Sequence, residues 1–307
     1  MTEPLAYLNG RFVLFAETAV AVTDAGFVQG VTVAEQLRTF GGKLFRLDRH
    51  LARLSRSLHI IGVSLDIAAL GAIAEELAAK NHALLAAGDD LGLTMFVTPG
   101  VYGSYAALAG HQGPTVCVHT QPLPFATWVE KYERGESLVV TRTRQVPADC
   151  WPVELKCRSR MHYYLADREA AAMQPGARAV LLDHEGFVTE SSTANVVAYS
   201  AREGLLSPPA EKILPGVSVA TLAELAAELQ IPWTNRPLLP QELAAADELL
   251  LCSTSPCVWS VTQFDGRPLG DGRPGPIAKK LLEAWGKRVQ IDIAGQARQF
   301  ANRAAKV

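Results

Sequence analysis

The sequence predicts an α+β fold in two domains that share a cleft. The chain has 307 residues, more than one compact core usually holds. Hydrophobic residues make up 49% and charged residues 20% of it, which is typical of a globular protein and not of a disordered chain. Short apolar strands and amphipathic helices are mixed without strict alternation, and this favours α+β over a doubly wound parallel sheet.

A small N-terminal domain is expected at residues 1–120. Asn9-Gly10 between two short apolar runs is a strong signal for a two-residue hairpin turn. Residues 35–40 predict another strand, and Asp48 is expected to cap a helix whose leucines recur at helical spacing. A different face of that helix carries three polar side chains: His50, Arg53 and Ser57.

The middle of the chain predicts a long loop and then a linker. Residues 100–114 are rich in Gly, Ala and Tyr, and loops of this length in compact domains are usually functional or mobile. Two prolines fix an extended path after Gln121, so residues 121–130 are interpreted as an interdomain linker. Residues 131–307 then form a larger C-terminal domain, with a helix expected at about 159–172.

The charge balance favours a small-molecule partner. The net charge is -2, from 29 basic and 31 acidic residues. Such a chain has no strong positive field that would attract nucleic acid or an anionic membrane. The five cysteines lack Cys-x-x-Cys spacing and are interpreted as free thiols in a reducing compartment. With no signal-peptide pattern and no apolar run of about 20 residues, a cytoplasmic protein is expected.

Several common catalytic motifs are absent from the sequence. It has no Gly-x-Ser-x-Gly elbow, no phosphate-binding P-loop, no His-Glu-x-x-His pair and no helix-initial Gly-x-Gly-x-x-Gly. None of the seven histidines lies at metal-ligand spacing from another or from a cysteine. Hydrolase, nucleotide-binding and metal-site hypotheses therefore have no support in the sequence.

Lys156 is a candidate amine nucleophile. It lies just before the helix expected at 159–172, and a lysine becomes nucleophilic when desolvation or a cationic neighbour lowers its pKa. Arg158 and Arg160 can supply that positive field. Taken alone, however, a solvated lysine at a helix start is the commoner explanation.

Other segments offer a carboxylate and sites for an anion. Glu190 ends a short strand and can pair with a protonated ring nitrogen, although a solvent-facing glutamate is the ordinary alternative. Residues 212–218 open a helix whose exposed amides favour a phosphate. The remaining anion-binding candidates are Arg53, Ser253, Thr254 and Ser255. Taken singly, each of these residues has an ordinary explanation as a helix cap, a turn serine or a surface arginine. Their order along the chain is therefore more informative than any one of them.

That order resembles the class IV aminotransferases, which are pyridoxal-phosphate enzymes of fold type IV. The resemblance runs through almost the whole chain, in the segments at residues 8–10, 24–27, 45–54, 188–195, 213–216 and 272–276. It implies that Lys156 is the Schiff-base lysine, which also shuttles the proton, and that Glu190 keeps the pyridine nitrogen protonated. It also implies that the phosphate is bound by Arg53, Val217, Ser218 and Thr254.

The resemblance further implies a homodimer, with the site between the two domains and the 100–114 loop reaching toward the partner's site. The substrate-binding positions implied are Ala34, Arg38, Thr94 and Ser255. Ala34 replaces an aromatic residue that usually walls the pocket, and Pro99 stands where the D-amino-acid enzymes use an arginine. Arg38 matches an arginine of the branched-chain enzymes.

The leading hypothesis is an aminotransferase acting between a branched-chain-like amino acid, or an amine, and a 2-oxo acid. A D-amino-acid or (R)-amine transaminase and a lyase of the aminodeoxychorismate type remain alternatives. A non-catalytic binding protein on the same fold is disfavoured because both Lys156 and Glu190 are present.

Overall fold

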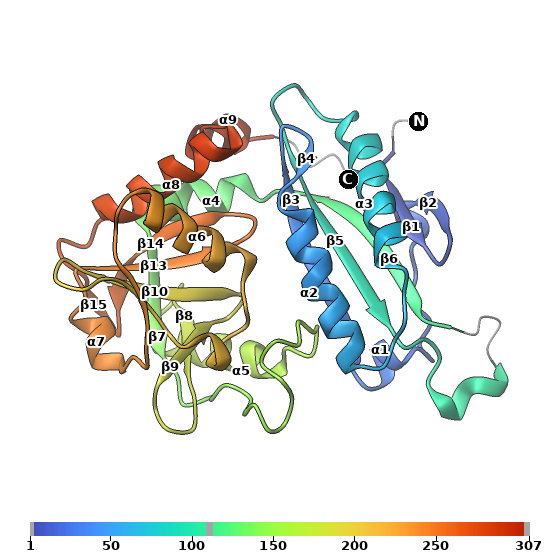
Figure 1. Ribbon diagram of the computed structural model, residues 1–307, viewed down its shortest axis with the longest axis horizontal. Coiled ribbons are helices and arrows are strands. Elements are labelled where there is room, and N and C mark those ends of the chain that lie inside the picture. Colours follow the sequence, from blue (N-terminus) through green and yellow to red (C-terminus); the bar gives the residue numbers. More distant parts are fainter. Residues whose placement is uncertain (1–2, 109–112, 304–307) are drawn as a thin grey trace. The chain divides into compact units, whose positions relative to one another are not determined.

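The computed structural model describes residues 3–108 and 113–303, and Figure 1 shows its helices and strands. The chain forms two compact units, each with its own sheet. The first unit is Met1–Leu123 with Glu154–Ser159, and the second unit is Pro124–Val153 with Arg160–Val307. The predicted α+β class is confirmed.

The first unit contains a six-stranded antiparallel sheet in the order β2-β1-β6-β5-β3-β4. The predicted hairpin at Asn9-Gly10 joins its first two strands. The strands are β1 (Leu5–Leu8), β2 (Arg11–Leu14), β3 (Val33–Phe40), β4 (Lys43–Leu44), β5 (Leu91–Thr98) and β6 (Thr115–Pro122). The short helical segments are η1 (Phe15–Glu17), α1 (Ala25–Val28) and η2 (Gly103–Leu108), and the rest of the loop predicted at 100–114 lies partly outside the described residues.

Two helices, α2 (Leu47–Ile60) and α3 (Ile67–His82), pack against this sheet. Leu54 from α2, Leu77 from α3 and Leu93 from the sheet meet in one buried cluster. The capping prediction at Asp48 was wrong: Asp48 lies in the first turn of α2, and the residue before the helix is Arg46, whose φ of 52° is left-handed. An acidic side chain in the first turn still interacts favourably with the helix dipole.

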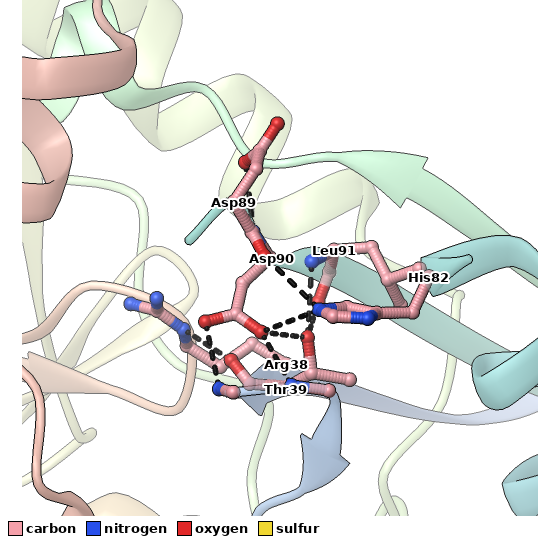
Figure 2. A network of polar contacts seen from close by, with 8 residues as sticks. Arg38, Thr39, His82, Asp89, Asp90 and Leu91 are labelled. Carbon is pink, nitrogen blue, oxygen red and sulfur yellow. Dashed lines mark hydrogen bonds and ion pairs between the residues drawn. The ribbon is translucent and has the colours of Figure 1, made fainter. Parts of the chain in front are cut away.

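A buried carboxylate fastens the β3–β4 hairpin to the start of β5 (Figure 2). Asp90 accepts hydrogen bonds from Thr39 Oγ1 at 2.5 Å, from the Gly41 amide at 3.1 Å and from the Gly42 amide at 3.0 Å. Both glycines have positive φ, 57° and 80°, as the two-residue turn between Phe40 and Lys43 requires. Asp90 therefore satisfies turn amides that the hairpin itself leaves unpaired.

The second unit contains a nine-stranded mixed sheet in the order β12-β11-β10-β13-β14-β7-β8-β9, with β9 also paired to β10 and β15 to β14. Its strands are β7 (Glu136–Val140), β8 (Arg178–Leu182), β9 (Val188–Ser191), β10 (Ala194–Ser200), β11 (Gly204–Ser207), β12 (Trp233–Asn235), β13 (Glu248–Ser253), β14 (Cys257–Phe264) and β15 (Arg267–Pro268). Its helical segments are α4 (Phe125–Arg134), α5 (Met161–Met173), η3 (Ala210–Lys212), α6 (Val217–Glu228), α7 (Pro240–Ala244), α8 (Pro276–Val289) and α9 (Ile293–Phe300).

Helix α5 covers β7 and β8, where Ala166 and Ala170 pack on Leu181, while α6 and α8 pack on β13 and β14. The boundary between the two units, after Leu123, lies inside the segment interpreted as a linker at 121–130, but this segment also contains the end of β6 and most of the first two turns of α4. Phe125 and Trp128, one helical turn apart, are both buried, and this apolar face explains the helix.

All five cysteines are free thiols in the structure. Within residues 3–108 and 113–303, no helix has the length and apolar character needed to cross a membrane.

Replacing Asp90 with alanine is expected to lower the free energy of unfolding by about 2–4 kcal/mol, because turn amides and Thr39 lose a charged acceptor. Urea denaturation followed by circular dichroism measures the change. E76A is the matched control, since Glu76 makes an exposed 3.4 Å pair with Lys80 and its loss should cost less than about 0.5 kcal/mol. Equal effects of the two substitutions would contradict this interpretation.

Candidate functional site

One face of α2 presents polar side chains to the core of the first unit. His50, Arg53 and Ser57 follow one another at helical spacing and are all buried. On the sheet, Glu35 lies between Val33 and Leu37 on the strand face that the helices cover, and it is also fully buried. A carboxylate in that position requires partners, because burying an unpaired charge is costly.

Glu35 finds its partners on α2. Arg53 donates to both carboxylate oxygens, from Nε and from Nη2, each at 2.8 Å, and His50 Nδ1 lies 2.6 Å from Oε2. Burial by itself would raise the pKa of Glu35, but the charge and hydrogen bonds of Arg53 and the hydrogen bond of His50 outweigh it and lower that pKa from 4.5 to about 2. Glu35 is therefore an anion that orients Arg53 and His50.

His50 is held as a neutral ring. Burial lowers its pKa, and the positive charges of Arg53 and Lys156 act in the same direction, whereas Glu35 raises it. Because Nδ1 then carries the proton toward Glu35, Nε2 is an acceptor. Nε2 is buried and has no hydrogen-bond partner among the described residues. A buried nitrogen of this kind can accept a hydrogen bond from a water molecule or from a bound polar group.

Lys156 is attached to the first unit by its backbone. Its amide donates to Ser57 Oγ at 3.2 Å, and its carbonyl accepts from the Ala34 amide at 2.9 Å. The next residues continue this pairing, since Cys157 bridges Val33. Lys156 was expected in the C-terminal domain, but these contacts group it with β3 and α2.

In the second unit, strand pairing places the candidate Glu190 in one row with residues of two neighbouring strands. Glu190 on β9 pairs with Asn195 on β10, and Asn195 pairs with Cys252 on β13. Paired residues of antiparallel strands point to the same face, and neighbouring strands are about 4.8 Å apart. The row therefore extends for about 10 Å from Glu190 to the strand end that precedes Thr254.

The carboxylate of Glu190 is held by two donors from other elements. Tyr163 on α5 donates its hydroxyl to Oε1 at 2.5 Å, and Gln145, after β7, donates from Nε2 to the same oxygen at 2.6 Å. Burial raises the pKa of Tyr163 well above its usual value, and the negative charge of Glu190 adds to this effect, so the phenol stays protonated. Glu190 itself is 5% exposed.

The amino end of α6 lies at the other end of this row. Gly216 is the N-cap residue of the helix, and as a glycine it supplies no side-chain cap to the first helix amides. A β-carbon on Gly216 would collide with the side-chain oxygen of Asn195, while Asn195 donates from Nδ2 to the Leu214 carbonyl at 3.2 Å. Helix α6 packs against β13, with Ser218 beside Cys252, so the helix start lies next to the strand that leads to Thr254.

The predicted phosphate-binding residues thus fall into two groups. Val217, Ser218 and Thr254 all belong to the second unit and are buried, and Ser255 follows in the turn before Cys257. Arg53 belongs to the first unit, where its contacts with Glu35 involve Nε and Nη2. Exposed helix-start amides and a buried arginine are both suited to an anion such as a phosphate.

The predicted substrate residues of the first unit share one sheet face. Ala34, Arg38 and Thr94 lie on the face opposite to α2 and α3, by the β3–β5 register. Ala34 and Thr94 are each 3% exposed. Arg38 is completely buried, with its guanidinium 4.1 Å from the centre of the Phe40 ring and its Nε donating to the Thr39 carbonyl (Figure 2).

Sequence reasoning did not identify four functional candidates: Glu35, Gln145, Tyr163 and Asn195. A signal existed for Glu35, because a glutamate among apolar residues of a central strand, on the same face as Val33 and Leu37, must be paired. No local signal existed for Gln145 or Tyr163, which meet Glu190 across 45 and 27 residues of sequence.

The family follows from comparison with known proteins. Residues 32–264 match the family amino-transferase class IV, and the chain belongs to that family. It is therefore a class IV aminotransferase, and the predicted family and enzyme class are confirmed.

Similar proteins agree with this assignment. D-alanine aminotransferase of Bacillus licheniformis is 29% identical over 290 residues, which cover 93% of this chain and 97% of the relative. A putative branched-chain-amino-acid aminotransferase of Methanocaldococcus jannaschii is 28% identical over 286 residues, 91% of this chain and 94% of the relative. The structure of a branched-chain amino acid aminotransferase of Escherichia coli has a TM-score of 0.84 at 22% identity, covering 93% of this chain and 94% of that chain. The last comparison confirms the predicted fold.

Replacing Glu35 with glutamine is expected to lower the free energy of unfolding at pH 7 by about 3–5 kcal/mol, because Arg53 is left buried without its counter-charge. The stabilising effect of a pKa lowered from 4.5 to about 2 is complete above pH 4.5 and is lost as the pH falls toward 2. The difference between the native protein and E35Q should therefore shrink over that range.

Urea unfolding at pH 7, 5 and 3 measures this difference, with E76Q on the exposed surface of α3 as a control that should change little at pH 7. A difference between the native protein and E35Q that stayed constant down to the lowest pH would argue against the ion pair.

Proposed function

We propose that this class IV aminotransferase uses pyridoxal 5'-phosphate to move an amino group from an amino acid or amine to a 2-oxo acid. The observation that carries the proposal is the row across β9, β10 and β13. The buried carboxyl group of Glu190 lies at one end, and the start of α6, whose N-cap Gly216 has no side chain, lies beside β13, the strand that leads to Thr254. This arrangement suits a molecule with a protonated ring nitrogen and a phosphate about 10 Å apart or less.

The residues present fit this cofactor. When bound, pyridoxal phosphate supplies an electron sink for the pair released at the substrate's α-carbon. Glu190 holds the proton on the ring nitrogen, and the amides of Val217 and Ser218 with the Thr254 hydroxyl bind the phosphate. Arg53, oriented by Glu35, adds a positive charge for the phosphate, and the buried unpartnered Nε2 of His50 indicates that the region near Arg53 receives a further polar group.

We propose that the amine of Lys156 binds the cofactor covalently. We also propose that it carries the proton between the α-carbon of the substrate and the carbon that bears the aldehyde group in the free cofactor. Its backbone is fixed to Ser57 and Ala34, so its side chain starts from a defined position. A positioned amine of this kind combines nucleophilic and acid–base roles. His50, whose pKa the positive charge of Lys156 helps to lower, lies in the same unit.

We propose a branched-chain-like amino acid as the donor, with a D-amino acid or (R)-amine as the alternative. Ala34 leaves room where the family usually has an aromatic side chain, and Arg38 and Thr94 share its sheet face. The relative named D-alanine aminotransferase supports the alternative, whereas Pro99, in place of the arginine that the D-amino-acid enzymes use there, argues against it.

We also propose that the enzyme is a cytoplasmic homodimer. Large apolar side chains are exposed near α1, with Val22 73% and Phe27 72% accessible, and a second copy can cover them.

The proposed reaction is tested with a panel of amino donors, using both enantiomers of alanine with 2-oxoglutarate and both enantiomers of leucine with pyruvate or 2-oxoglutarate as acceptor. Beyond the single equivalent that each loaded site releases in the first half-reaction, oxo acid is expected to form from the donor only when an acceptor is present. K156A should lower the rate by about 10³-fold or more, because the proton carrier is lost. K280A, on the exposed surface of α8, is the control and should keep the native rate.

Two results would contradict the proposal. Turnover that is unchanged without acceptor would indicate a lyase of the aminodeoxychorismate type, which shares Lys156 and Glu190. A K156A protein with native activity would remove the lysine from the mechanism altogether.

A further inference from the structure

We infer that Tyr163 and Gln145 are positioning residues that hold Glu190 as an oriented anion and so keep the shared proton on the cofactor's ring nitrogen. This inference rests on the proposed function. It adds two residues, from α5 and from the segment after β7, to the part of the site that Glu190 occupies.

The geometry at Glu190 is fixed from two directions. Tyr163 Oη lies 2.5 Å and Gln145 Nε2 lies 2.6 Å from the same oxygen, Oε1. Hydrogen bonds of this length to a carboxylate are charge-assisted and roughly twice as strong as neutral ones. The carboxylate therefore cannot rotate without losing both donors.

The donor side of each contact is also determined. Gln145 Oε1 accepts from the Val146 amide at 3.0 Å, so the amide group presents Nε2 to Glu190. The Gln145 backbone is held in turn, since its own amide donates to the Leu182 carbonyl at 3.0 Å. The Tyr163 ring packs against His162, with ring centres 4.1 Å apart.

The charges that face this cluster favour a protonated phenol. Burial and the Glu190 charge raise the pKa of Tyr163, while the positive charge of Arg160 at the start of α5 opposes them. The net result is a phenol that keeps its proton and donates a hydrogen bond to Glu190. Tyr163 therefore acts as a hydrogen-bond donor to Glu190.

The consequence for the proton follows from a balance of two states. In one state the ring nitrogen carries the proton and Glu190 is a carboxylate; in the other the proton has moved to Glu190 and the ring is neutral. Donors to the carboxylate stabilise the first state and not the second. Removing one donor should shift this equilibrium toward protonated Glu190 by about 10- to 100-fold, and removing both should shift it further.

The test uses the holoenzyme loaded with pyridoxal phosphate that carries ¹⁵N in the ring, since the ¹⁵N chemical shift reports directly whether that nitrogen is protonated. The variants are Y163F, Q145L and the double variant. Each should move the resonance from the protonated toward the neutral position at pH 7, with the largest change in the double variant. The turnover number should fall in the same order, while KM for the donor changes little, because neither residue is proposed to touch the substrate.

Y164F is the matched control, because Tyr164 is the next residue of α5 and is 60% exposed. It should leave the ¹⁵N shift unchanged. If the native protein fails to retain the cofactor, the proposed function and this inference both fail. If the double variant keeps the cofactor and the native ¹⁵N shift, this inference alone is wrong. Y163F and Q145L each remove a different donor to Glu190. If one of them folds poorly, the ¹⁵N shift of the other still tests the inference.

Discussion

The candidate site in the first unit depends on one buried carboxylate. Glu35 lies in the middle of β3 and is paired with Arg53 and His50 on α2. Breaking a buried pair of this kind leaves an uncompensated charge, which makes the pairing a strong constraint on how α2 lies on the sheet. The same helix face carries Ser57, which holds the Lys156 backbone. The placement of the candidate nucleophile thus follows from the ion pair.

In the second unit, the buried carboxyl group of Glu190 and the start of α6 are held at a fixed separation. Strand pairing sets that separation, because Glu190, Asn195 and Cys252 are consecutive partners across three strands. Asn195 helps to fix this separation in two ways. It is the middle residue of the row, and its side chain also contacts the loop that leads into α6. A β-sheet provides a rigid spacing of this kind more reliably than loops do.

Much of this could be predicted from the sequence, and the rest could not, for physical reasons. Strands, most helices and the order of Lys156, Glu190 and Thr254 follow from local patterns. Helix α4 was missed because the prolines before Phe125 suggested an extended path. Pro124 is in fact the residue before the helix, and the helix buries the apolar side chains of Phe125 and Trp128. The Tyr163 and Gln145 contacts with Glu190 depend on tertiary packing, which no local pattern encodes. The roles assigned to the predicted site residues remain predictions.

The central claim is that Lys156 is the covalent attachment point of the cofactor, and it can be measured directly. The protein loaded with pyridoxal phosphate is reduced with borohydride, digested and analysed by mass spectrometry. The account predicts a phosphopyridoxyl group on the peptide that contains Lys156. A modification on another lysine, or none in a protein that retains the cofactor, would contradict it.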